Sequence, residues 1–408
     1  MNVDPLDVMM EKDHVIPYFL PIFSAEKQIV VGYEVVARLV TPDGVKRLGW
    51  FFTDKSIPSE YRNELDDHLQ KLALDHYSAS NFKGTMYFNY DARQLVKDAG
   101  ESFLNRIQPY IDNQSITYNQ IILGLNEKDV HTYYKEIKHV LTYLQSLGIR
   151  IGIDNFGQSS SQMDQIAMVH PNVIRVNVSF LNQDSLPQLY NDVHQSLAML
   201  SRKIGATLLF DGITTFNQLN YAWRNGARYY QGPYLMASSS ELIEEDACKE
   251  RMQKDFQHFI TYERRKMQAQ HELSNELGSA LRTTLKQVKT SDTLDEMILS
   301  VAMDLSQYMF RIYICNEEGF QQTSNVEKDE EGKWLLKKEG LNKNWSWRPY
   351  FLENIVRMNV EKKGILSDLY TDIERDEQIR TFAYPISDSL YLFIDIPYEY
   401  LYEQDDLI

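Results

Sequence analysis

The amino-acid sequence predicts an α/β protein in which a (β/α)₈ TIM-like barrel is followed by a long linker helix and a small α+β domain. Three observations support this fold class. Strand-like and helical segments alternate up to about residue 236, a proline-free segment follows, and hairpin-like runs dominate the remainder. A chain of 408 residues is also too long for one ordinary domain.

The first part of the chain contains eight short runs rich in β-branched and aromatic residues. Amphipathic helical stretches separate most of them, as at 60–77, 128–147, 185–203 and 214–225. This alternation predicts a mainly parallel sheet, and eight such units in about 230 residues are typical of a (β/α)₈ barrel. Because the first two runs have no long helix between them, we expect one of them to be antiparallel. The runs lie at 15–24, 28–40, 85–91, 120–127, 149–157, 173–181, 206–214 and 227–236.

The sequence predicts three parts: a barrel at residues 1–240, a helical linker at 241–290 and a C-terminal domain at 291–408. The linker contains no proline, and Met252, Phe256 and Phe259 recur at helical spacing. One or two long helices satisfy this pattern. Its first half also fits a surface helix packed on the barrel.

The C-terminal part is expected to be a compact α+β domain built on antiparallel hairpins. Residues 310–327 have the form of a hairpin with a turn at 317–319, and residues 381–397 form a second with a turn at 387–388. A short helix is predicted at 349–358.

The acidic composition excludes several classes of function. The formal net charge of -16 disfavours nonspecific binding to DNA or to an anionic membrane. No run approaches the length of apolar sequence that spans a bilayer, so we expect no membrane span. The two cysteines, Cys248 and Cys315, are far apart and are expected to be reduced thiols in a cytoplasmic protein.

Residues able to bind a metal ion or a phosphate stand at the ends of most predicted strands. In a (β/α)₈ barrel the carboxyl ends of the strands face the active site. Carboxylate and amide oxygens without histidine or cysteine suit Mg²⁺, Mn²⁺ or Ca²⁺, and arginine beside them suits a phosphate. These residues are Glu34, Arg38, Asn89, Glu127, Asp154, Asn155, Arg175, Asp211 and Gln231.

The spacing of these residues resembles the EAL-domain family over residues 10–240. Members of that family are (β/α)₈ barrels that bind cyclic di-GMP, and the active ones hydrolyse it with two divalent metals. The linker and tail resemble the YkuI type of EAL protein, in which a PAS-like domain of the Cache kind follows the barrel. The motifs are Glu34-Val35-Val36-Ala37-Arg38, Asn89-Tyr90-Asp91, Asp154-Asn155-Phe156-Gly157 followed by Ser159-Ser160-Ser161, and Gln231-Gly232.

The resemblance implies a role for each matching residue. Glu34, Asn89, Asp154 and Asn155 stand at metal-ligand positions, with Mg²⁺ or Mn²⁺ as the implied cofactor. Arg38 matches the arginine that contacts a ligand phosphate. The catalytic positions that also contact the ligand are held by Arg175, Asp211 and Gln231.

Several positions depart from the family's pattern. Gly124 stands where the family has a metal-binding glutamate, and Asn155 replaces an aspartate. Because both changes remove a carboxylate, we expect weakened metal binding. Arg175 replaces a lysine and cannot act as an acid or base near neutral pH. In an alternative reading, Arg175 forms a salt bridge to Asp154 or Asp211 that fills the space of a metal. Further departures are Leu20, Asn177, Thr214 and Asp211, which replaces a glutamate and is one methylene shorter.

The tail carries a candidate site for a small ligand. Trp347, Arg348, Tyr370 and Asp372 are similar to the set with which Cache-type sensors hold amino acids. In such a site arginine binds a carboxylate and aspartate binds an ammonium group. The alternative is that these aromatic residues form the core of a small β domain.

The sequence therefore predicts a cytoplasmic cyclic di-GMP signalling protein, dimeric through its central helix. Its degenerate barrel would act as a nucleotide receptor or regulatory module without efficient hydrolysis. Two alternatives stay open. In one, the protein is an impaired phosphodiesterase in which Glu34, Asn89, Asp154 and Asp211 hold metal. In the other, it is an interaction scaffold that binds no nucleotide.

Overall fold

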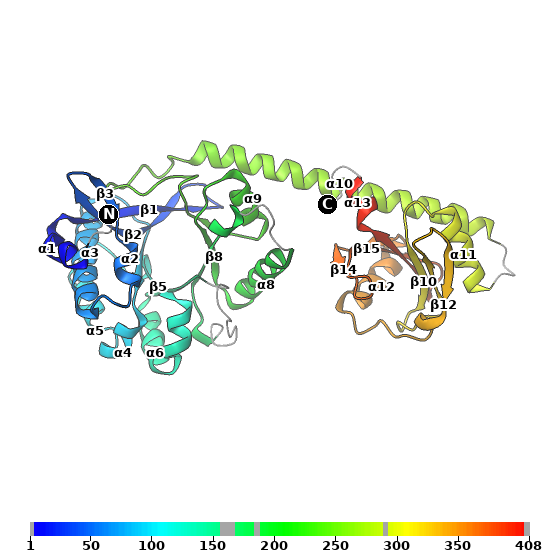
Figure 1. Cartoon of the computed structure of the whole chain (residues 1–408), viewed down its shortest axis with the longest axis horizontal. Coiled ribbons are helices and arrows are strands. Elements are labelled where there is room, and N and C mark those ends of the chain that lie inside the picture. The colour runs from blue at the N-terminus through cyan, green and yellow to red at the C-terminus, as the bar shows by residue number, and fades with distance from the viewer. Residues whose placement is uncertain (1–3, 156–167, 183–187, 289–292, 404–408) are drawn as a thin grey trace. The chain divides into compact units, whose positions relative to one another are not determined.

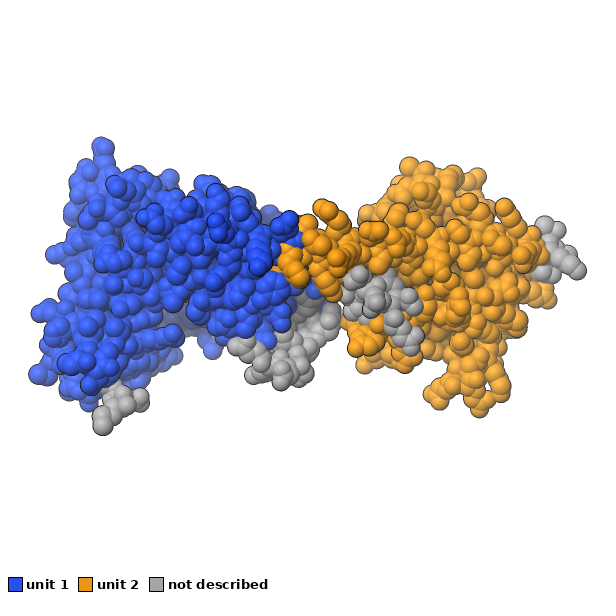
Figure 2. Space-filling view, turned by 90° about the horizontal axis from the view of Figure 1, so that it is seen from above, with its two compact units in different colours: residues 1–257 blue, residues 258–408 orange. Residues whose placement is uncertain are grey.

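The computed structural model describes residues 4–155, 168–182, 188–288 and 293–403 (Figure 1). The chain divides into two compact units, residues 1–257 and residues 258–408, which we call unit 1 and unit 2 (Figure 2). The long helix α10 (Lys249–Gln287) crosses the division between them.

Unit 1 contains a closed barrel of eight strands, which confirms the predicted fold class. The strands follow the order β1-β9-β8-β7-β6-β5-β4-β2, and the pairing of β1 with β2 closes the ring. Strand β1 is antiparallel to both of its neighbours, as expected for one of the first two runs, and the remaining barrel pairs are parallel. The strands are β1 (Val15–Ser24), β2 (Val30–Thr41), β4 (Thr85–Tyr90), β5 (Ile121–Asn126), β6 (Arg150–Asp154), β7 (Val173–Asn177), β8 (Thr207–Asp211) and β9 (Tyr229–Tyr230), with β3 (Gly44–Arg47) added outside β2.

Helices connect the barrel strands, and four of them confirm predicted segments. These are α3 (Ser59–Ala79), α6 (Glu127–Leu147), α8 (Gln188–Ile204) and α9 (Phe216–Arg224). At the start of α6, the Asn126 side chain caps the helix by accepting a hydrogen bond from the N–H of Lys128. The sequence did not predict the short helices α1 (Pro5–Met10), α2 (Gly49–Thr53), α4 (Ala92–Asp98) and α5 (Glu101–Asp112).

The barrel interior is filled by side chains rather than open. Ile22, Tyr87, Ile122, Val173 and Leu209, from five different strands, form one buried cluster. Layers of this kind make the barrel a packed core and leave its chemistry to the strand ends.

Helix α10 is one continuous helix, which settles whether one or two helices fill the predicted linker. Its second half is part of the core of unit 2, because Leu273, Leu277 and Leu281 pack there with Ile312 and Ile394. In the described part of the chain, no helix combines the length and hydrophobicity needed to cross a bilayer.

Unit 2 is an antiparallel sheet with helices on both faces. Alternate residues of β10 face opposite ways, as the strand pleat requires. Ile312 and Ile314 join the core beneath α10 and α11 (Leu294–Asp304), whereas Tyr313 and Cys315 join a second core beneath α12 (Pro349–Glu361).

The sheet of unit 2 confirms both predicted hairpins and the short helix after residue 348. Its strand order is β12-β11-β10-β16-β15-β13, and β14 pairs with β15. The strands are β10 (Arg311–Asn316), β11 (Asn325–Lys328), β12 (Trp334–Lys337), β13 (Ile365–Leu366), β14 (Tyr370–Thr371), β15 (Gln378–Pro385) and β16 (Leu390–Pro397), and α13 (Tyr398–Glu403) follows.

Candidate functional site

Arg175 lies at the centre of the candidate site, at the carboxyl ends of the barrel strands. Its Nη1 atom is 2.8 Å from Oε1 of Glu34, and its Nη2 atom is 2.7 Å from Oδ2 of Asp154. Nη2 also donates to Oδ1 of Asn89 at 2.8 Å, while Asn89 Nδ2 donates to Glu34 Oε1 at 2.7 Å. We call these four residues, from β2, β4, β6 and β7, the Arg175 cluster. The guanidinium occupies the point on which three predicted metal ligands converge.

The charges of the Arg175 cluster are withdrawn from water. The side chains of Arg175, Glu34 and Asp154 are 11%, 8% and 6% exposed. Burial alone lowers the pKa of Arg175, but Asp154 and Glu34 hold it well above its usual range. The guanidinium therefore stays charged and compensates both carboxylates.

Tyr87 fills the remaining space between β4, β5 and β6. Its ring centroid is 4.9 Å from Cζ of Arg175, and its hydroxyl donates to Oδ1 of Asp154. Gly124 and Gly152 are register partners on β5 and β6. A Cβ added at Gly124 would lie 2.3 Å from Cε1 of Tyr87, and one added at Gly152 would lie 2.3 Å from its hydroxyl oxygen. The ring thus uses the volume that a side chain at position 124 would need.

As arranged, these residues do not fit a divalent ion. In the described part of the chain, no group of three or more His, Cys, Asp or Glu side chains is placed to hold one. A second cation beside the Arg175 guanidinium would be repelled at short range. The alternative reading of the sequence expected a salt bridge to Asp154 or Asp211, and the structure has the one to Asp154 with Glu34 as the second partner.

Asp211 ends β8 next to the Arg175 cluster and is half-buried. Burial raises the pKa of its carboxyl to about 6, while the charge of Arg175 opposes that rise and the charge of Glu34 adds to it. A carboxyl group with this pKa gains or loses its charge just below neutral pH, so the net charge of the site depends on pH through Asp211.

The other predicted site residues are not part of the Arg175 cluster. Asn155 is exposed, has a left-handed backbone with φ of 59°, and makes no side-chain hydrogen bond to the described residues. Gln231 is fully buried and donates from Nε2 to the carbonyl of Leu20 at 3.3 Å, while its Oε1 atom has no partner among the described residues. Arg38 donates to the carbonyl of Ala37 at 2.9 Å and to Oγ of Ser238 at 3.0 Å.

Two positions that lack the family's acids take part in local structure instead. Asn177 Oδ1 accepts from the N–H and the hydroxyl of Ser179 at 2.8 and 2.6 Å, which forms a turn after β7. Thr214 donates its N–H and its hydroxyl to Oε1 of Gln218 at 2.6 and 2.8 Å, at the start of α9. The predicted run Ser159-Ser160-Ser161, with Phe156 and Gly157 of the preceding motif, lies outside the described residues.

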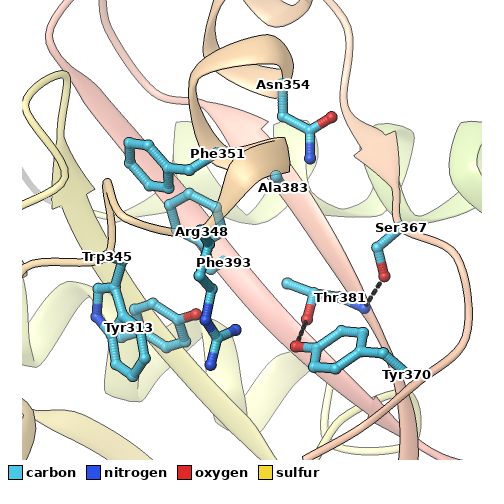
Figure 3. Close-up of a pocket in the computed structure, with 10 residues that line it drawn as sticks. All are labelled: Tyr313, Trp345, Arg348, Phe351, Asn354, Ser367, Tyr370, Thr381, Ala383 and Phe393. Atoms are coloured by element: carbon cyan, nitrogen blue, oxygen red, sulfur yellow. Dashed lines mark hydrogen bonds between the residues drawn. The ribbon is translucent and has the colours of Figure 1, made fainter. Parts of the chain in front are cut away.

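The tail residues predicted to bind a ligand fall into three places in unit 2. Arg348 and Tyr370 line one cavity beneath α12 (Figure 3). Asp372 lies in the adjoining space, where its Oδ2 atom is 2.5 Å from Nη2 of Arg311. Trp347 is 66% exposed and lines neither space; its neighbour Trp345 lines both.

Sequence reasoning missed two central residues, and each had a signal. Tyr87 faces Gly124 and Gly152, and two glycines in register on neighbouring strands indicate that a large ring covers them. Arg311 opens the apolar run of β10 and is buried. A charge at the head of a buried strand indicates a buried ion pair.

Two families match the chain in sequence. The EAL domain matches residues 4–238, and YkuI_C, an EAL-domain associated signalling protein domain, matches residues 242–408. Together they span the barrel and most of the remainder of the chain.

The chain is also similar to proteins of known sequence or structure. The uncharacterized EAL-domain containing protein YkuI of Bacillus subtilis (strain 168) is 42% identical over 410 residues, which cover 100% of both chains. The crystal structure of the Bacillus subtilis YkuI protein, in complex with substrate c-di-GMP and calcium, covers 100% of both chains with a TM-score of 0.93. The cyclic di-GMP phosphodiesterase PdeL of Escherichia coli (strain K12) is 20% identical over 56% of this chain and 64% of its own.

Full-length similarity and two adjacent family matches lead to one assignment. The chain belongs to the EAL-domain family, and within it to the YkuI type, in which an EAL barrel is followed by the associated signalling domain.

Proposed function

We propose that the chain is a cytoplasmic cyclic di-GMP signalling protein whose barrel binds the nucleotide without efficient hydrolysis. The observation that carries this proposal is the position of Arg175, whose guanidinium engages Glu34, Asn89 and Asp154 together. The ligand is supported by the relative YkuI, whose crystal structure contains c-di-GMP.

Arginines supply the phosphate contacts in this proposal. Arg38 lies on the same strand as Glu34, and its guanidinium is fixed by Ala37, by Ser238 and by the Tyr18 ring, whose centroid is 5.6 Å from Cζ. A guanidinium held in this way still has N–H donors for a phosphate. Arg175 adds a second positive charge, and Gln231 and Asp211 are the further ligand contacts.

Slow hydrolysis follows from the residues that a two-metal reaction would require. Metal ions about 3.5–4 Å apart need shared anionic ligands. Here Glu34 and Asp154 are committed to Arg175, Tyr87 covers Gly124, and Asn155 is neutral and exposed. We therefore expect Mg²⁺ and Mn²⁺ to bind weakly and no efficient turnover.

Unit 2 is the sensory part in this proposal, a PAS-like domain of the Cache kind that holds a small ligand. Its antiparallel sheet with helices on both faces is compatible with that role. The protein is proposed to act as a homodimer through α10, which exposes Ile260, Tyr262 and Met267 at 46%, 41% and 69%. Light scattering of the intact chain measures the dimer directly, and a monomer at all concentrations would contradict it.

Calorimetry with cyclic di-GMP tests the nucleotide proposal. The intact chain is titrated in EDTA and in Mg²⁺, Mn²⁺ or Ca²⁺, and the nucleotide is then analysed by chromatography. We expect binding in EDTA and recovery of intact cyclic di-GMP. Linear dinucleotide formed on an enzymatic timescale would favour an impaired phosphodiesterase. If cyclic di-GMP produced no heat of binding in any buffer, the nucleotide proposal would fail and the interaction scaffold would be the remaining hypothesis.

Arginine variants locate the binding site. Arg38→Met should weaken nucleotide binding roughly tenfold to a hundredfold, because a hydrogen bond to a charged group contributes about 1.5–3 kcal/mol. Arg228→Met is the matched control, since Arg228 precedes β9 and pairs at 3.0 Å with the exposed Glu26. If both variants bound cyclic di-GMP with equal affinity, Arg38 would not be a contact of the nucleotide.

A further inference from the structure

Unit 2 contains a second cavity, next to the one beneath α12, which we call the Arg311 cavity. Strand β10, the loop before α12 and the segment after β14 enclose it. Its volume is about 140 Å³. An engineered apolar cavity of about 150 Å³ binds benzene, so the Arg311 cavity has room for one molecule of about that size.

The Arg311 cavity has an aromatic wall and an open side. Tyr313 and Trp345 form the wall, with ring centroids 6.1 Å apart (Figure 3). On the other side lie Ile373, which is 78% exposed, and Glu374, whose side chain is 48% exposed. A flat molecule can therefore enter from solvent and pack against aromatic rings.

The charges that line the Arg311 cavity are balanced. Among the described residues, the lining contains two cations, Arg311 and Arg348, and two carboxylates, Asp372 and Glu374. The same lining therefore attracts and repels a charged ligand, and its net charge selects neither an anion nor a cation.

The carboxylates of the lining are already paired. Oδ2 of Asp372 is 2.5 Å from Nη2 of Arg311, and its Oδ1 accepts from the N–H groups of Glu374 and Arg375 at 3.1 and 3.0 Å. Glu374 is 3.1 Å from Nη1 of Arg311 and 3.2 Å from Nζ of Lys343. A cationic ligand would have to compete with these partners after losing its own water, which is costly.

Arg311 is also compensated, but it still has hydrogen-bond donors to offer. Its Nε donates to Asp395 at 2.6 Å, and Nη1 and Nη2 each donate once, to Glu374 and Asp372. A guanidinium has five N–H groups, so one on Nη1 and one on Nη2 make no hydrogen bond to the described residues. These N–H groups need an acceptor and not a further negative charge.

Tyr313 supplies another donor to the Arg311 cavity. Its side chain lines the cavity, and its hydroxyl makes no hydrogen bond to the part of the chain that the structure describes. Burial raises the pKa of this hydroxyl well above its usual range, and the charge of Asp395 adds to the rise. The hydroxyl therefore keeps its proton and can donate it to an acceptor.

We propose that the Arg311 cavity binds a flat, neutral ring of about the size of benzene that carries hydrogen-bond acceptors, which Arg311 and Tyr313 engage. This inference rests on the proposed sensory role of unit 2 and is separate from nucleotide binding by the barrel. The sequence suggested a ligand with a carboxylate and an ammonium group, whereas the paired charges of the cavity favour a neutral one.

Two neutral rings test the need for an acceptor. Pyridazine has two adjacent ring nitrogens that accept hydrogen bonds, and benzene has the same shape without them. Ligand-detected NMR titrations of the intact chain measure both dissociation constants. We expect pyridazine to bind roughly twofold to tenfold more tightly for each hydrogen bond that it accepts. The proposal is overturned if pyridazine does not bind or if benzene binds as tightly.

Three charged probes of similar size test the need for neutrality. They are 1-methylpyridinium, a cation; tetrazolate, an anion; and L-alanine, which carries both an ammonium group and a carboxylate. We expect each to bind at least about tenfold more weakly than pyridazine, because each must lose water around a charge for which the cavity has no balance. Tighter binding of any one of them would contradict a neutral ligand.

A conservative variant tests the position. Tyr313→Phe removes only the hydroxyl and should weaken pyridazine binding roughly twofold to tenfold. Tyr384→Phe is the matched control, because Tyr384 packs against the core on the other face of the same sheet. Thermal unfolding checks that both variants fold. If both bound pyridazine as the wild-type chain does, Tyr313 would not be a contact and the proposed site would be wrong.

Cyclic di-GMP titrations of the same variants keep the two proposals apart. Both variants should bind the nucleotide like the wild-type chain. If the wild-type chain binds pyridazine but not cyclic di-GMP, the proposed function of the barrel fails and this inference stands. The reverse result overturns the proposal for the Arg311 cavity alone.

Discussion

Both units contain a buried arginine that pairs with several acids, Arg175 in unit 1 and Arg311 in unit 2, and the acids differ in where they lie in the fold. Arg175 in unit 1 contacts Glu34 and Asp154 at the end of the barrel. Arg311 in unit 2 contacts Asp372, Asp395 and Glu374 at 2.5, 2.6 and 3.1 Å.

The acids around Arg311 belong to neighbouring parts of one sheet. Asp395 is its register partner on β16, and Glu327 is its register partner on β11. Asp372 directly follows β14. The guanidinium therefore ties strands together, and its side chain is only 9% exposed.

The acids around Arg175 stand at strand ends, where a barrel normally does chemistry. The half-buried Asp211 lies beside them. A buried arginine therefore ties strands of one sheet together in unit 2, whereas in unit 1 it holds acids together at the end of a barrel. Four substitutions test this difference between the two arginines.

Removing Arg311 should have the largest effect. Arg311→Met leaves Asp395, which is fully buried, without its counter-charge, and breaking a buried ion pair costs about 3–5 kcal/mol. Scanning calorimetry should show a lower unfolding temperature for unit 2 and little change for unit 1. Arg357→Met, at an exposed pair on α12, is the control, and a similar small shift in both variants would contradict a structural role for Arg311.

Removing Arg175 should convert its cluster into a cation site. Arg175→Met leaves the oxygens of Glu34, Asn89 and Asp154 directed at a common point. A divalent ion at a hundred times its Kd would then stabilise unit 1 by about 2.7 kcal/mol. Thermal unfolding in Ca²⁺ and in EDTA measures this. The wild-type chain and Arg228→Met should respond much less, and an equal response would show that ion and guanidinium coexist.

A methyl group at position 124 should disturb the site through Tyr87. Gly124→Ala places a Cβ 2.3 Å from Cε1 of that ring, and overpacking of this kind costs about 1–3 kcal/mol. In a Tyr87→Ala background the same substitution should lower the free energy of unfolding by less, because the ring that the methyl group would meet is absent. A double-mutant cycle by urea unfolding measures the coupling. Additive effects would mean that the ring moves aside freely.

Neutralising Asp211 should have the smallest effect, and one that depends on pH. Burial raises the pKa of Asp211 to about 6, above its value in the unfolded chain. The folded state therefore loses stability as pH rises from about 4 to 6, and the loss remains at higher pH. Asp211→Asn should stabilise unit 1 at neutral pH and have no effect near pH 4. Asp43→Asn, in an exposed turn, is the control, and a pH-independent difference would exclude the titration of Asp211.

The barrel and the members of the Arg175 cluster could be predicted from the sequence because they follow simple periodic rules. Strand alternation located the eight strands, although β9 is only two residues long within the predicted run 227–236. The strand-end rule collected Glu34, Asn89 and Asp154 with Arg175. It could not show that Arg175 sits among the other three, because that depends on side-chain packing.

The remaining features depend on contacts between distant segments. The three acids that accept hydrogen bonds from Arg311 lie 61 to 84 residues away in sequence, so no local pattern reveals them. The sequence does not distinguish the roles of Trp345 and Trp347. In the fold, Trp345 lines the cavity beneath α12 and Trp347 is exposed. The helices α4 and α5 were missed because Gly100 and Pro109 interrupt the helical pattern.

The ring of Tyr87 over Gly124 limits which side chains position 124 can accept. A single substitution could place a carboxylate at position 124 only if the space beside the strand were open. Because the ring occupies that space, a glutamate at position 124 would collide with Tyr87 unless Tyr87 were also replaced. Replacing Tyr87 would remove the hydrogen bond that its hydroxyl donates to Asp154. Position 124 therefore accepts a larger side chain only together with a change at position 87.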